Sequence, residues 1–355
     1  MNHRLVEVQR RMKEKGLDSL LITSPYNRRY LSGFTGSAGY LLLTLERAQL
    51  ITDFRYVDQA TEQAPDFEVI RHEGPILQEV GKQLTGLQAL KTGFEKQYAT
   101  YALYEGLLAC RENGEWVGVQ GLVEELRMVK SADEIAVIRQ ACQIADDTFQ
   151  HILGFIKPGV TERDVAIELE FHMRKLGAAS SSFDIIVASG ERGALPHGVA
   201  SDKVLNPGEL VTMDFGAYYN GYVSDLTRTI AVGEPSEKLR EIYETVLQAQ
   251  LAGVQQIKPG ITGKEADALT RDVISEAGYG QYFGHSTGHG IGLEVHEGPG
   301  LSSKSDVVLK PGMVVTVEPG IYLSQLGGVR IEDDVIITEN GCEIITQSTK
   351  ELIIL

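Results

Sequence analysis

The stretch "IKPGVTERDVAIELEFHMRKLG", residues 156–177, returns as "IKPGITGKEADALTRDVISEAG" at residues 257–278, a constant offset of 101 residues. Each copy begins with a shared Ile-Lys-Pro-Gly, continues with a Thr that has an acidic residue three positions later, and ends with Gly. The Thr and the acid have the spacing of a capping box, and a glycine is typical of a helix end, so each copy predicts a helix. One long period indicates two related half-domains, because a solenoid has shorter and more numerous repeats. We therefore expect a functional site at the junction of the two halves.

A domain boundary is predicted just before this repeat. In "RMVKSADEIAVIRQAC" Ser131 and Glu134 have the spacing of a capping box, and apolar residues then continue along one helical face. A long helix is expected to open a second domain that covers residues 131–355. Residues 1–125 alternate helical and strand patterns, with "SLLIT", "YLLLT", "AQLIT" and "FEVIR" as strands, which predicts a separate α/β domain.

Composition narrows the class of protein. A formal net charge of -16 argues against nucleic acid as a partner, because phosphates require a basic surface. The three cysteines are far apart and fit neither a disulfide framework nor a zinc motif, which is typical of a reducing compartment. The N-terminus carries charge throughout and lacks the apolar core of a secretory signal, and no apolar run reaches the roughly 18 residues of a membrane span. We expect a cytoplasmic protein that binds neither nucleic acid nor membrane.

The stretch "LVTMDFGAYYNGYVSDLTRTIAV" predicts a β-hairpin, because Asn-Gly between alternating strands favours a two-residue type I′ turn. In that register Asp214 lies opposite Thr227, and Asp225 lies opposite Gly216. The two aspartates then share one face as diagonal neighbours, with Cβ atoms up to roughly 7 to 8 Å apart. Two like charges at this separation repel each other unless a cation lies between them, so the hairpin indicates a cation site.

Three histidines lie in the glycine-rich run "GHSTGHGIGLEVHEGPG", residues 284–300. His285 and His289 stand four apart, which on a helix would place both side chains on one metal-binding face. The interleaved glycines each weaken a helix by about 0.5 to 1 kcal/mol, so the run is expected to be strand and loop. Either histidine, or His296, could by itself be an ordinary hydrogen-bonded residue, and only partners elsewhere in the chain can decide.

Two further acids follow the histidines. The apolar strand in "GMVVTVEPGIYL" ends at Glu318, and "GGVRIEDDVIIT" is predicted to be one strand with Arg330 and Glu332 on the same face. Single acids at strand ends are usually solvated. Four acids together with a histidine are mostly hard oxygen ligands, a set that favours Mn(II) over structural zinc. Asp333 and Asp334 stay open as competitors of Glu332 for this role, although Glu332 shares a strand face with Arg330.

These motifs resemble the metal-dependent peptidases with the pita-bread fold, in particular their aminopeptidase P and prolidase branch. The resemblance is carried, in the expected order, by "MDFGAYYNGYVSDLTRT", "HSTGHGIGLEVHE", "VEPGIY" and "VRIEDDVIIT". It covers the whole second domain, and residues 1–125 look like the creatinase-like N-terminal domain of that branch. The implied fold is an α/β N-terminal domain followed by an α+β pita-bread catalytic domain (creatinase/aminopeptidase-like) with an internal pseudo-twofold repeat.

The resemblance also implies roles for individual residues. The metal ligands of the family fall on Asp214, Asp225, His289, Glu318 and Glu332, with Asp225 and Glu332 bridging two divalent ions. Mn(II) is the favoured metal, and Co(II) or Zn(II) are alternatives. Two further groups of side chains are implied: the catalytic residues His296, His197 and Glu318, and the substrate-binding residues His285 and Arg330.

The implied activity is that of a dimetal exopeptidase that hydrolyses the Xaa-Pro bond in dipeptides or at the N-terminus of longer peptides. Metal coordination lowers the pKa of water by several units, which would supply a nucleophile at neutral pH. His296 would then stabilise the oxyanion, while Glu318 passes a proton to the departing proline nitrogen. Three alternatives stay open: a non-catalytic binding module of the same fold, a creatinase-like hydrolase, and a methionine aminopeptidase-like activity. The resemblance further implies a homodimer or a higher homo-oligomer.

Overall fold

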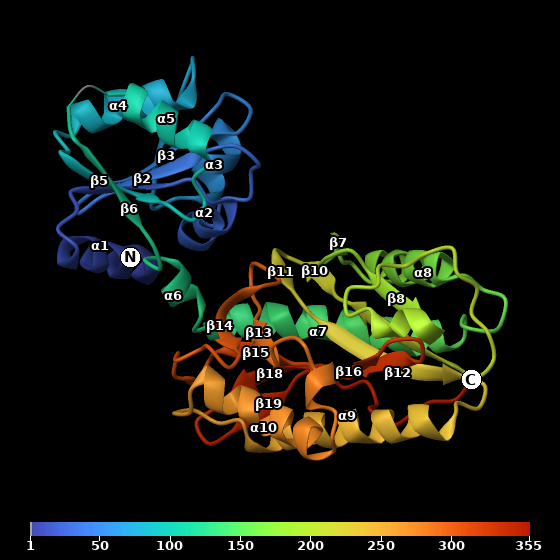
Figure 1. Ribbon diagram of the computed structural model, residues 1–355. Coiled ribbons are helices and arrows are strands. Elements are labelled where there is room, and N and C mark those ends of the chain that lie inside the picture. Colours follow the sequence, from blue (N-terminus) through green and yellow to red (C-terminus); the bar gives the residue numbers. More distant parts are fainter. Residues whose placement is uncertain (1, 112) are drawn as a thin grey trace. The chain divides into compact units, whose positions relative to one another are not determined.

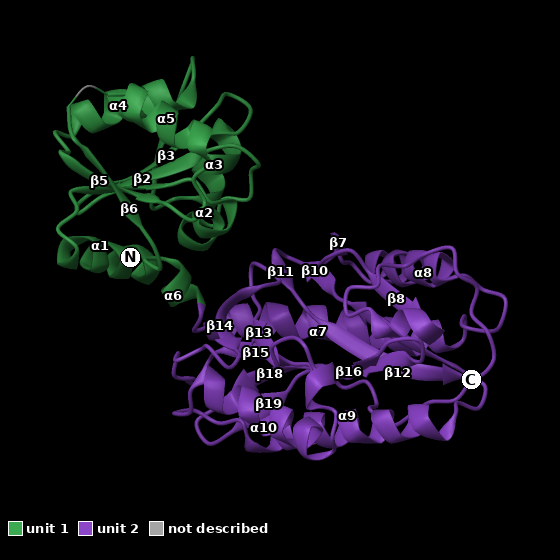
Figure 2. Ribbon diagram, in the orientation of Figure 1, with its two compact units in different colours: residues 1–127 green, residues 128–355 purple. Residues whose placement is uncertain are grey.

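The computed structural model of the chain describes residues 2–111 and 113–355, and Figure 1 shows its helices and strands. The chain divides into two compact units, residues 1–127 and residues 128–355 (Figure 2). Within the described residues, none of the helices combines the length and the apolar character that crossing a bilayer requires.

Unit 1 is built on a six-stranded mixed sheet with the strand order β4-β3-β2-β1-β5-β6. Its four strands predicted from the sequence are confirmed as β1 to β4, and apolar side chains of α4 and α5 pack on the sheet. The strands are β1 (Ser19–Ile22), β2 (Tyr40–Thr44), β3 (Ala48–Thr52), β4 (Glu68–Arg71), β5 (Lys91–Glu95) and β6 (Glu115–Val119). The helices are α1 (His3–Glu14), α2 (Pro25–Ser32), α3 (Val57–Gln63), α4 (Ile76–Gly86), α5 (Tyr101–Ala109) and α6 (Glu124–Arg127).

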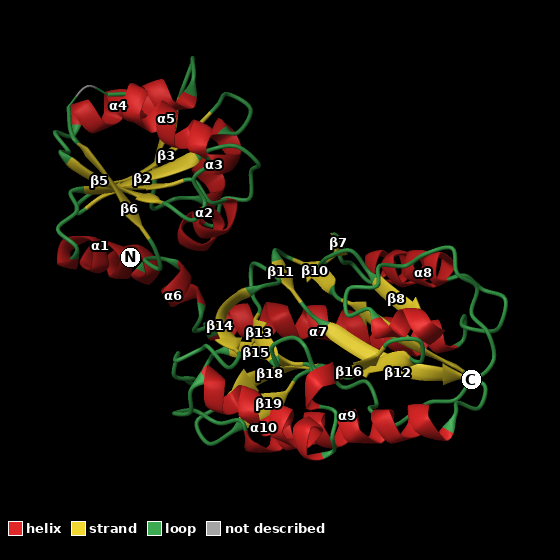
Figure 3. Cartoon of the chain, viewed as in Figure 1, coloured by secondary structure: helices red, strands yellow, loops and turns green. Residues whose placement is uncertain are grey.

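Unit 2 combines long helices with short sheets, as Figure 3 shows. The helices are α7 (Ala132–Leu153), α8 (Glu162–Lys175), α9 (Glu237–Gln256) and α10 (Gly263–Glu276), with the short 3-10 helices η1 (Gly190–Ala194) and η2 (Gly280–Tyr282). A three-stranded sheet contains β8 (Ile186–Ser189), β9 (Glu209–Phe215) and β12 (Leu226–Val232). A five-stranded sheet contains β13 (Gly288–Gly290), β14 (Glu297–Leu301), β15 (Val314–Val317), β18 (Asp333–Ile337) and β19 (Cys342–Ile344). Smaller sheets pair β16 (Gly320–Leu323) with β17 (Gly327–Arg330), and β10 (Ala217–Tyr219) with β7 (Ser180–Ser181) and β11 (Tyr222–Val223).

The internal repeat organises unit 2. Capping boxes at Thr161 and Thr262 begin α8 and α10, as the sequence predicts. Apolar residues of α7 and α8 pack on β8, β9 and β12, while those of α9 and α10 pack on β15 and β18. The repeat also extends beyond the helices, because "VLNPGELVTMDFG" (204–216) and "VLKPGMVVTVEPG" (308–320) form β9 and β15 with their flanks. Each half therefore carries one acid, Asp214 or Glu318, at the same end of an equivalent strand.

The hairpin predicted around Asn220 is confirmed in its register. Thr227 pairs with Asp214 in the ladder between β9 and β12, and Asn220 and Gly221 have positive φ values of 46° and 84°, as a type I′ turn requires. The ladder is interrupted at Gly216, where a Cβ atom would lie 1.8 Å from the carbonyl oxygen of Ser224. This interruption leaves Asp225 just ahead of β12.

The prediction of one continuous strand through Arg330 and Glu332 is wrong. The segment forms β17, which pairs with β16, and then β18, which pairs with β15 and β19. The chain changes sheets at Glu332, whose backbone N–H donates to the carbonyl oxygen of Thr227 (3.1 Å) and whose carbonyl accepts from Arg228. Glu332 thus lies where the two halves of unit 2 meet, which alternation along a strand does not reveal.

Candidate metal centre

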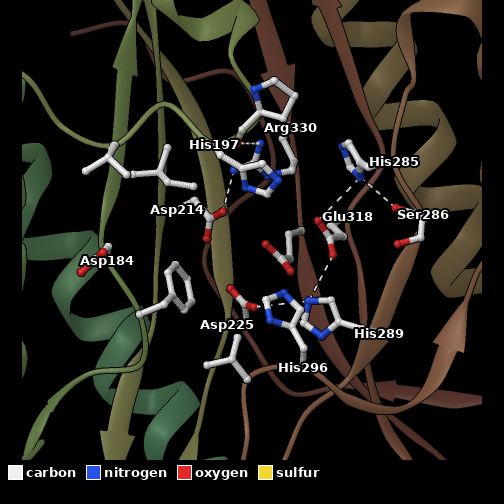
Figure 4. A pocket seen from close by; sticks show the side chains of 16 residues that line it. Asp184, His197, Asp214, Asp225, His285, Ser286, His289, His296, Glu318 and Arg330 are labelled. Atoms are coloured by element: carbon white, nitrogen blue, oxygen red, sulfur yellow. Dashed lines mark hydrogen bonds and ion pairs between the residues drawn. The ribbon is translucent and has the colours of Figure 1, made fainter. Parts of the chain in front are cut away.

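A pocket of about 510 Å³ lies in unit 2, and side chains from both halves line it (Figure 4). The lining residues of the second half lie on or beside β13, β14, β15 and β17. All the candidate site residues selected from the sequence line this pocket: His197, Asp214, Asp225, His285, His289, His296, Glu318, Arg330 and Glu332. The structure therefore brings together residues that lie up to 135 positions apart, from His197 to Glu332.

Three of the predicted ligands form a tight group. Ligand atoms of Asp225, His289 and Glu332 all lie within 4.8 Å of one another, a spacing that suits a single metal ion. Glu318 lies beside this group, with its Oε1 3.3 Å from Nε2 of His289. Asp214 is held differently, since its Oδ2 accepts a hydrogen bond from Arg330 Nη2 at 2.6 Å.

Threonine hydroxyls fix the orientation of two of the acids. The hydroxyl of Thr227 donates to Glu332 Oε2 at 2.6 Å, and the hydroxyl of Thr316 donates to Glu318 Oε1 at 3.2 Å. Such partners orient ligands before a metal arrives. Each carboxylate keeps its other oxygen for a further interaction.

The residues fit a divalent cation. Among the described side chains, three buried carboxylate oxygens in the pocket have no hydrogen-bond partner: Asp214 Oδ1, Asp225 Oδ1 and Glu332 Oε1. A buried oxygen without a donor is costly, and most are satisfied by a proton donor, water or an ion. Carboxylate oxygens supplemented by one imidazole nitrogen are ligands that Mn(II) and similar ions accept.

Burial is the main cause of the shifted pKa values in the pocket. Burial, and then repulsion from neighbouring carboxylates, raises the pKa of Asp225 and of Glu332 well above the ordinary range. Burial and repulsion from Asp214 raise the pKa of Glu318 to about 8, although Arg330 opposes the shift. Burial and the neighbouring His296 lower the pKa of His289 to about 4, so its imidazole is neutral at pH 7, the form that binds metals. A bound cation would allow these carboxylates to ionise together.

The two acids that compete with Glu332 in the sequence have other partners. Asp333 pairs with Arg228 (2.7 Å) and Lys350 (2.6 Å). Asp334 Oδ2 accepts from the backbone N–H of Asp225 at 2.9 Å. Neither is among the described residues that line the pocket, so the geometry favours Glu332 as the ligand candidate.

The substrate-side candidates form a second layer. Arg330 Nη1 donates to Tyr322 Oη (2.9 Å) and to the carbonyl of Pro196 (3.1 Å), while His285 Nε2 lies 2.7 Å from the same Tyr322 hydroxyl. His197 and His296 are exposed at the pocket, and the His296 ring centroid lies 4.2 Å from that of His289.

Sequence reasoning missed Tyr322 and Thr227 as parts of this arrangement. Thr227 donates to Glu332 and accepts from Arg330 Nε at 3.2 Å. Its position opposite Asp214 in the predicted hairpin was a usable signal. Tyr322 is diagonal to Arg330 in the ladder of β16 and β17, but the sequence does not predict that pairing strongly because the turn carries no Asn-Gly or Asp-Gly signal.

Comparison with known proteins places this geometry in a family. The model of the metallopeptidase family M24 matches residues 136–339, and that of the creatinase/prolidase N-terminal domain matches residues 4–129. An Xaa-Pro dipeptidase from Pyrococcus horikoshii is 43% identical over 361 residues, which cover 99% of each chain.

Solved structures give the same result. A structure of an Xaa-Pro dipeptidase from Bacillus anthracis is 59% identical, with a TM-score of 0.98 and 99% coverage of both chains. A structure of an X-Pro aminopeptidase from Thermotoga maritima is 41% identical, with a TM-score of 0.90 over 97% of this chain and 100% of that one. The fold class expected from the sequence is confirmed. The chain belongs to metallopeptidase family M24, and it combines the pita-bread catalytic domain with a creatinase/prolidase N-terminal domain.

Proposed function

We propose that the protein is a metal-dependent exopeptidase that hydrolyses the bond between an N-terminal residue and proline, as an Xaa-Pro dipeptidase or Xaa-Pro aminopeptidase. The observation that carries the proposal is the group formed by Asp225, His289 and Glu332, whose buried carboxylate oxygens lack proton donors. The similarity to proteins named Xaa-Pro dipeptidase supports the substrate class. The names of these relatives support this reading over the alternatives of a non-catalytic module or a methionine aminopeptidase.

Five side chains would hold two divalent ions: Asp214, Asp225, His289, Glu318 and Glu332. The oxygen-rich set favours Mn(II), with Co(II) or Zn(II) as alternatives. Bound divalent ions would supply the nucleophile, because coordination lowers the pKa of water to near neutrality.

The remaining residues of the pocket bind the substrate and move protons. His296 faces the reacting carbonyl, where an imidazole N–H stabilises developing negative charge. His197 shapes the pocket that receives the proline. Glu318 passes a proton to the departing proline nitrogen, which otherwise leaves as an unstable anion. His285 and Arg330 bind the substrate, and Arg330 also donates to the carbonyl of Pro196 in the pocket wall.

Proline specificity has a physical basis in the same pocket. An Xaa-Pro bond has no N–H, and its φ angle is restricted, so a site for it relies on shape and apolar contact. The side chains that line the pocket include five apolar ones: Phe183, Ile186, Pro196, Val199 and Val295. They give the pyrrolidine ring a surface that excludes water.

The decisive experiment compares Ala-Pro with Ala-Pro-Ala as substrates of the Mn(II)-loaded protein, with a chelated sample as the control. Release of alanine from the dipeptide alone identifies an Xaa-Pro dipeptidase, and release from the tripeptide identifies an aminopeptidase. Loss of activity on chelation is required in both cases. If the folded, fully Mn(II)-loaded protein cleaves neither peptide, the proposal is contradicted.

We also propose that residues 1–125 and 131–355 fold as separate domains, and that the chain forms a homodimer or higher homo-oligomer in the cytoplasm. Light scattering coupled to gel filtration tests the oligomer, since a mass near the 38.9 kDa of one chain contradicts it. Limited proteolysis at residues 126–130 tests the boundary, because two stable fragments are expected.

A further inference from the structure

Glu162 is a buried carboxylate that the proposed reaction does not use. It is the first residue of α8, and its side chain is 0% exposed. Five donors surround its two oxygens: the backbone N–H groups of Ser189 (2.8 Å) and Ser201 (3.1 Å), their hydroxyls (2.9 and 2.6 Å), and Arg192 Nε (2.9 Å). These five hydrogen bonds hold the carboxylate firmly in place, because a hydrogen bond to a charged group is stronger than one between neutral groups.

The donors belong to the two ends of one loop. Ser189 is the last residue of β8, and Ser201 ends the loop that follows η1. Between them Arg192 also donates from Nη2 to the carbonyl of Val199 at 2.7 Å, which joins the two arms of the loop. Glu162 therefore closes residues 189–201 at their base.

This loop is a wall of the pocket. Pro196, His197 and Val199 line the cavity, and the carbonyl of Pro196 accepts from Arg330. Arg330 in turn holds Asp214 at 2.6 Å. A continuous set of hydrogen bonds and short chain segments thus leads from Glu162 to the candidate metal centre.

The second half of unit 2 shows that the helix itself does not need this carboxylate. The position equivalent to Glu162 is Gly263, where a Cβ atom would lie 2.1 Å from the carbonyl oxygen of Gly300. Both helices start with the same backbone contacts, since the N–H of Glu162 donates to Lys203 and that of Gly263 donates to Val307. Both are also capped by their own Thr, so the Glu162 side chain is an addition peculiar to the first half.

Glu162 is ionised in the folded protein. Burial acts to raise its pKa, but hydrogen bonds from Ser201, Ser189 and Arg192 outweigh it and hold the pKa below the ordinary value. Its bonds to the loop therefore persist through the neutral range.

We propose that Glu162 is a positioning residue, which holds the loop of residues 189–201 in place and with it Pro196 and His197 on the substrate side of the pocket. Its effect on catalysis rests on the proposed function, whereas its effect on the loop does not. The variant Glu162→Gln keeps the shape and removes the charge. Asp164→Asn is the matched control, because it makes the same change in the exposed capping box of the same helix.

The rate of tryptic cleavage after Arg192 measures how easily the loop of residues 189–201 opens, and the assay requires neither metal nor substrate. Glu162→Gln removes the charged partner of the Arg192 guanidinium and loosens the loop, so the fragment ending at Arg192 is expected to appear about tenfold faster, as local opening becomes easier. Asp164→Asn and the unaltered protein are expected to be cleaved slowly at the same rate. Equal rates in all three proteins overturn the proposal.

Kinetics on Ala-Pro then test the consequence for the substrate. In Glu162→Gln, kcat/KM is expected to fall about tenfold, mainly through KM, because a misplaced wall far from the reacting atoms costs orientation. Metal content measured by atomic emission should stay unchanged. Loss of metal, or an equal effect in Asp164→Asn, identifies a general structural role and contradicts the proposal.

A variant on the loop keeps the proposal testable if Glu162→Gln does not fold. Ser201→Ala removes one of the five donors and should shift proteolysis and KM in the same direction by a smaller factor. If Ser201→Ala changes neither, the proposal fails. If the unaltered protein cleaves neither peptide, the proposed function fails, while the proteolysis result still decides the role of Glu162 in the loop.

Discussion

The two halves of unit 2 share one backbone plan and differ in what they offer a metal ion. Asp214 and Glu318 lie at the same end of equivalent strands, and Gly208 and Gly312, which precede these strands, have the same positive φ of 86°. Yet Asp214 pairs with Arg330, while Glu318 lies beside His289. The repeat duplicates the scaffold, and the side chains that meet at the junction decide the chemistry of each half.

The histidine illustrates the difference further. His289 lies on β13, whose neighbouring glycines allow close approach to β15, since a Cβ atom at Gly288 would lie 2.0 Å from the carbonyl oxygen of Thr316. The first half contributes only oxygen ligands to the candidate centre. One half therefore provides hard ligands alone, and the other adds a nitrogen.

The largest expected effect tests whether both halves are needed. Asp225→Ala removes a ligand candidate of the first half, and Glu332→Ala removes one of the second. Each should lower activity more than about 100-fold, because loss of a residue that only orients a metal ligand already costs about 10- to 100-fold. Both should also lose bound metal by atomic emission. The chelated variants should be more stable to heat than the chelated parent, since one of several repelling carboxylates is gone.

Asp184→Asn is the control for these two variants. Asp184 lines the same pocket without belonging to the candidate ligands, so metal content should be retained. If Asp225→Ala keeps full activity and full metal loading, Asp225 of the first half is not a metal ligand.

An intermediate effect tests the contact that crosses between the halves. Arg330→Lys keeps the charge but loses the planar fork that reaches Asp214, Tyr322 and Pro196, so kcat/KM should fall roughly 10- to 100-fold. Tyr322→Phe removes one hydroxyl and should cost less. The double variant should show a smaller loss than the two losses combined, because both changes break the same hydrogen bond. Fully additive losses would show that the two residues act independently.

The pH dependence of stability tests the charge balance at the junction. The pKa of Glu318 is raised from 4.5 to about 8, so its contribution to stability is complete at low pH and is lost as pH rises toward 8. The raised pKa values of Asp225 and Glu332 act in the same direction. His285 and His289, lowered from 6.5 to about 4, act in the opposite direction between pH 4 and 6.5.

The melting temperature of the metal-free protein should therefore fall between pH 6.5 and 8, where the histidines no longer contribute. Mn(II) should remove this fall, because a saturating ligand stabilises by about 2.7 kcal/mol at 100 times its Kd and holds the carboxylates ionised. Parallel curves with and without Mn(II) would contradict the assignment of the cation site.

The smallest expected effect is on melting temperature, when the N-caps of the equivalent helices α8 and α10 are removed. Thr161→Ala and Thr262→Ala each remove one N-cap, which costs about 1 kcal/mol and a few °C in melting temperature. The two losses should be equal if the repeat duplicates helix capping faithfully. A markedly larger loss for Thr161 would show that the loop held by Glu162 adds to the stability of its helix.

Local features of this protein were predictable from the sequence because neighbouring residues decide them. The capping boxes at Ser131, Thr161 and Thr262 mark the observed helix starts. The Asn220-Gly221 turn fixes the hairpin register, and so the position of Asp214 opposite Thr227. The repeat and the family motifs selected the pocket residues, although periodicity alone could not choose among the acids at 332–334.

The tertiary structure alone decided how these local pieces meet. The strand through Arg330 divides because Glu332 bonds across the junction to Thr227, a partner 105 residues away. The pairing of Arg330 with Asp214, the hydroxyl of Tyr322 between Arg330 and His285, and the closure of the loop by Glu162 all join segments distant in sequence. Local preferences fix helices and turns within a few residues, whereas contacts across a junction depend on the packing of whole elements, which no short stretch of sequence contains.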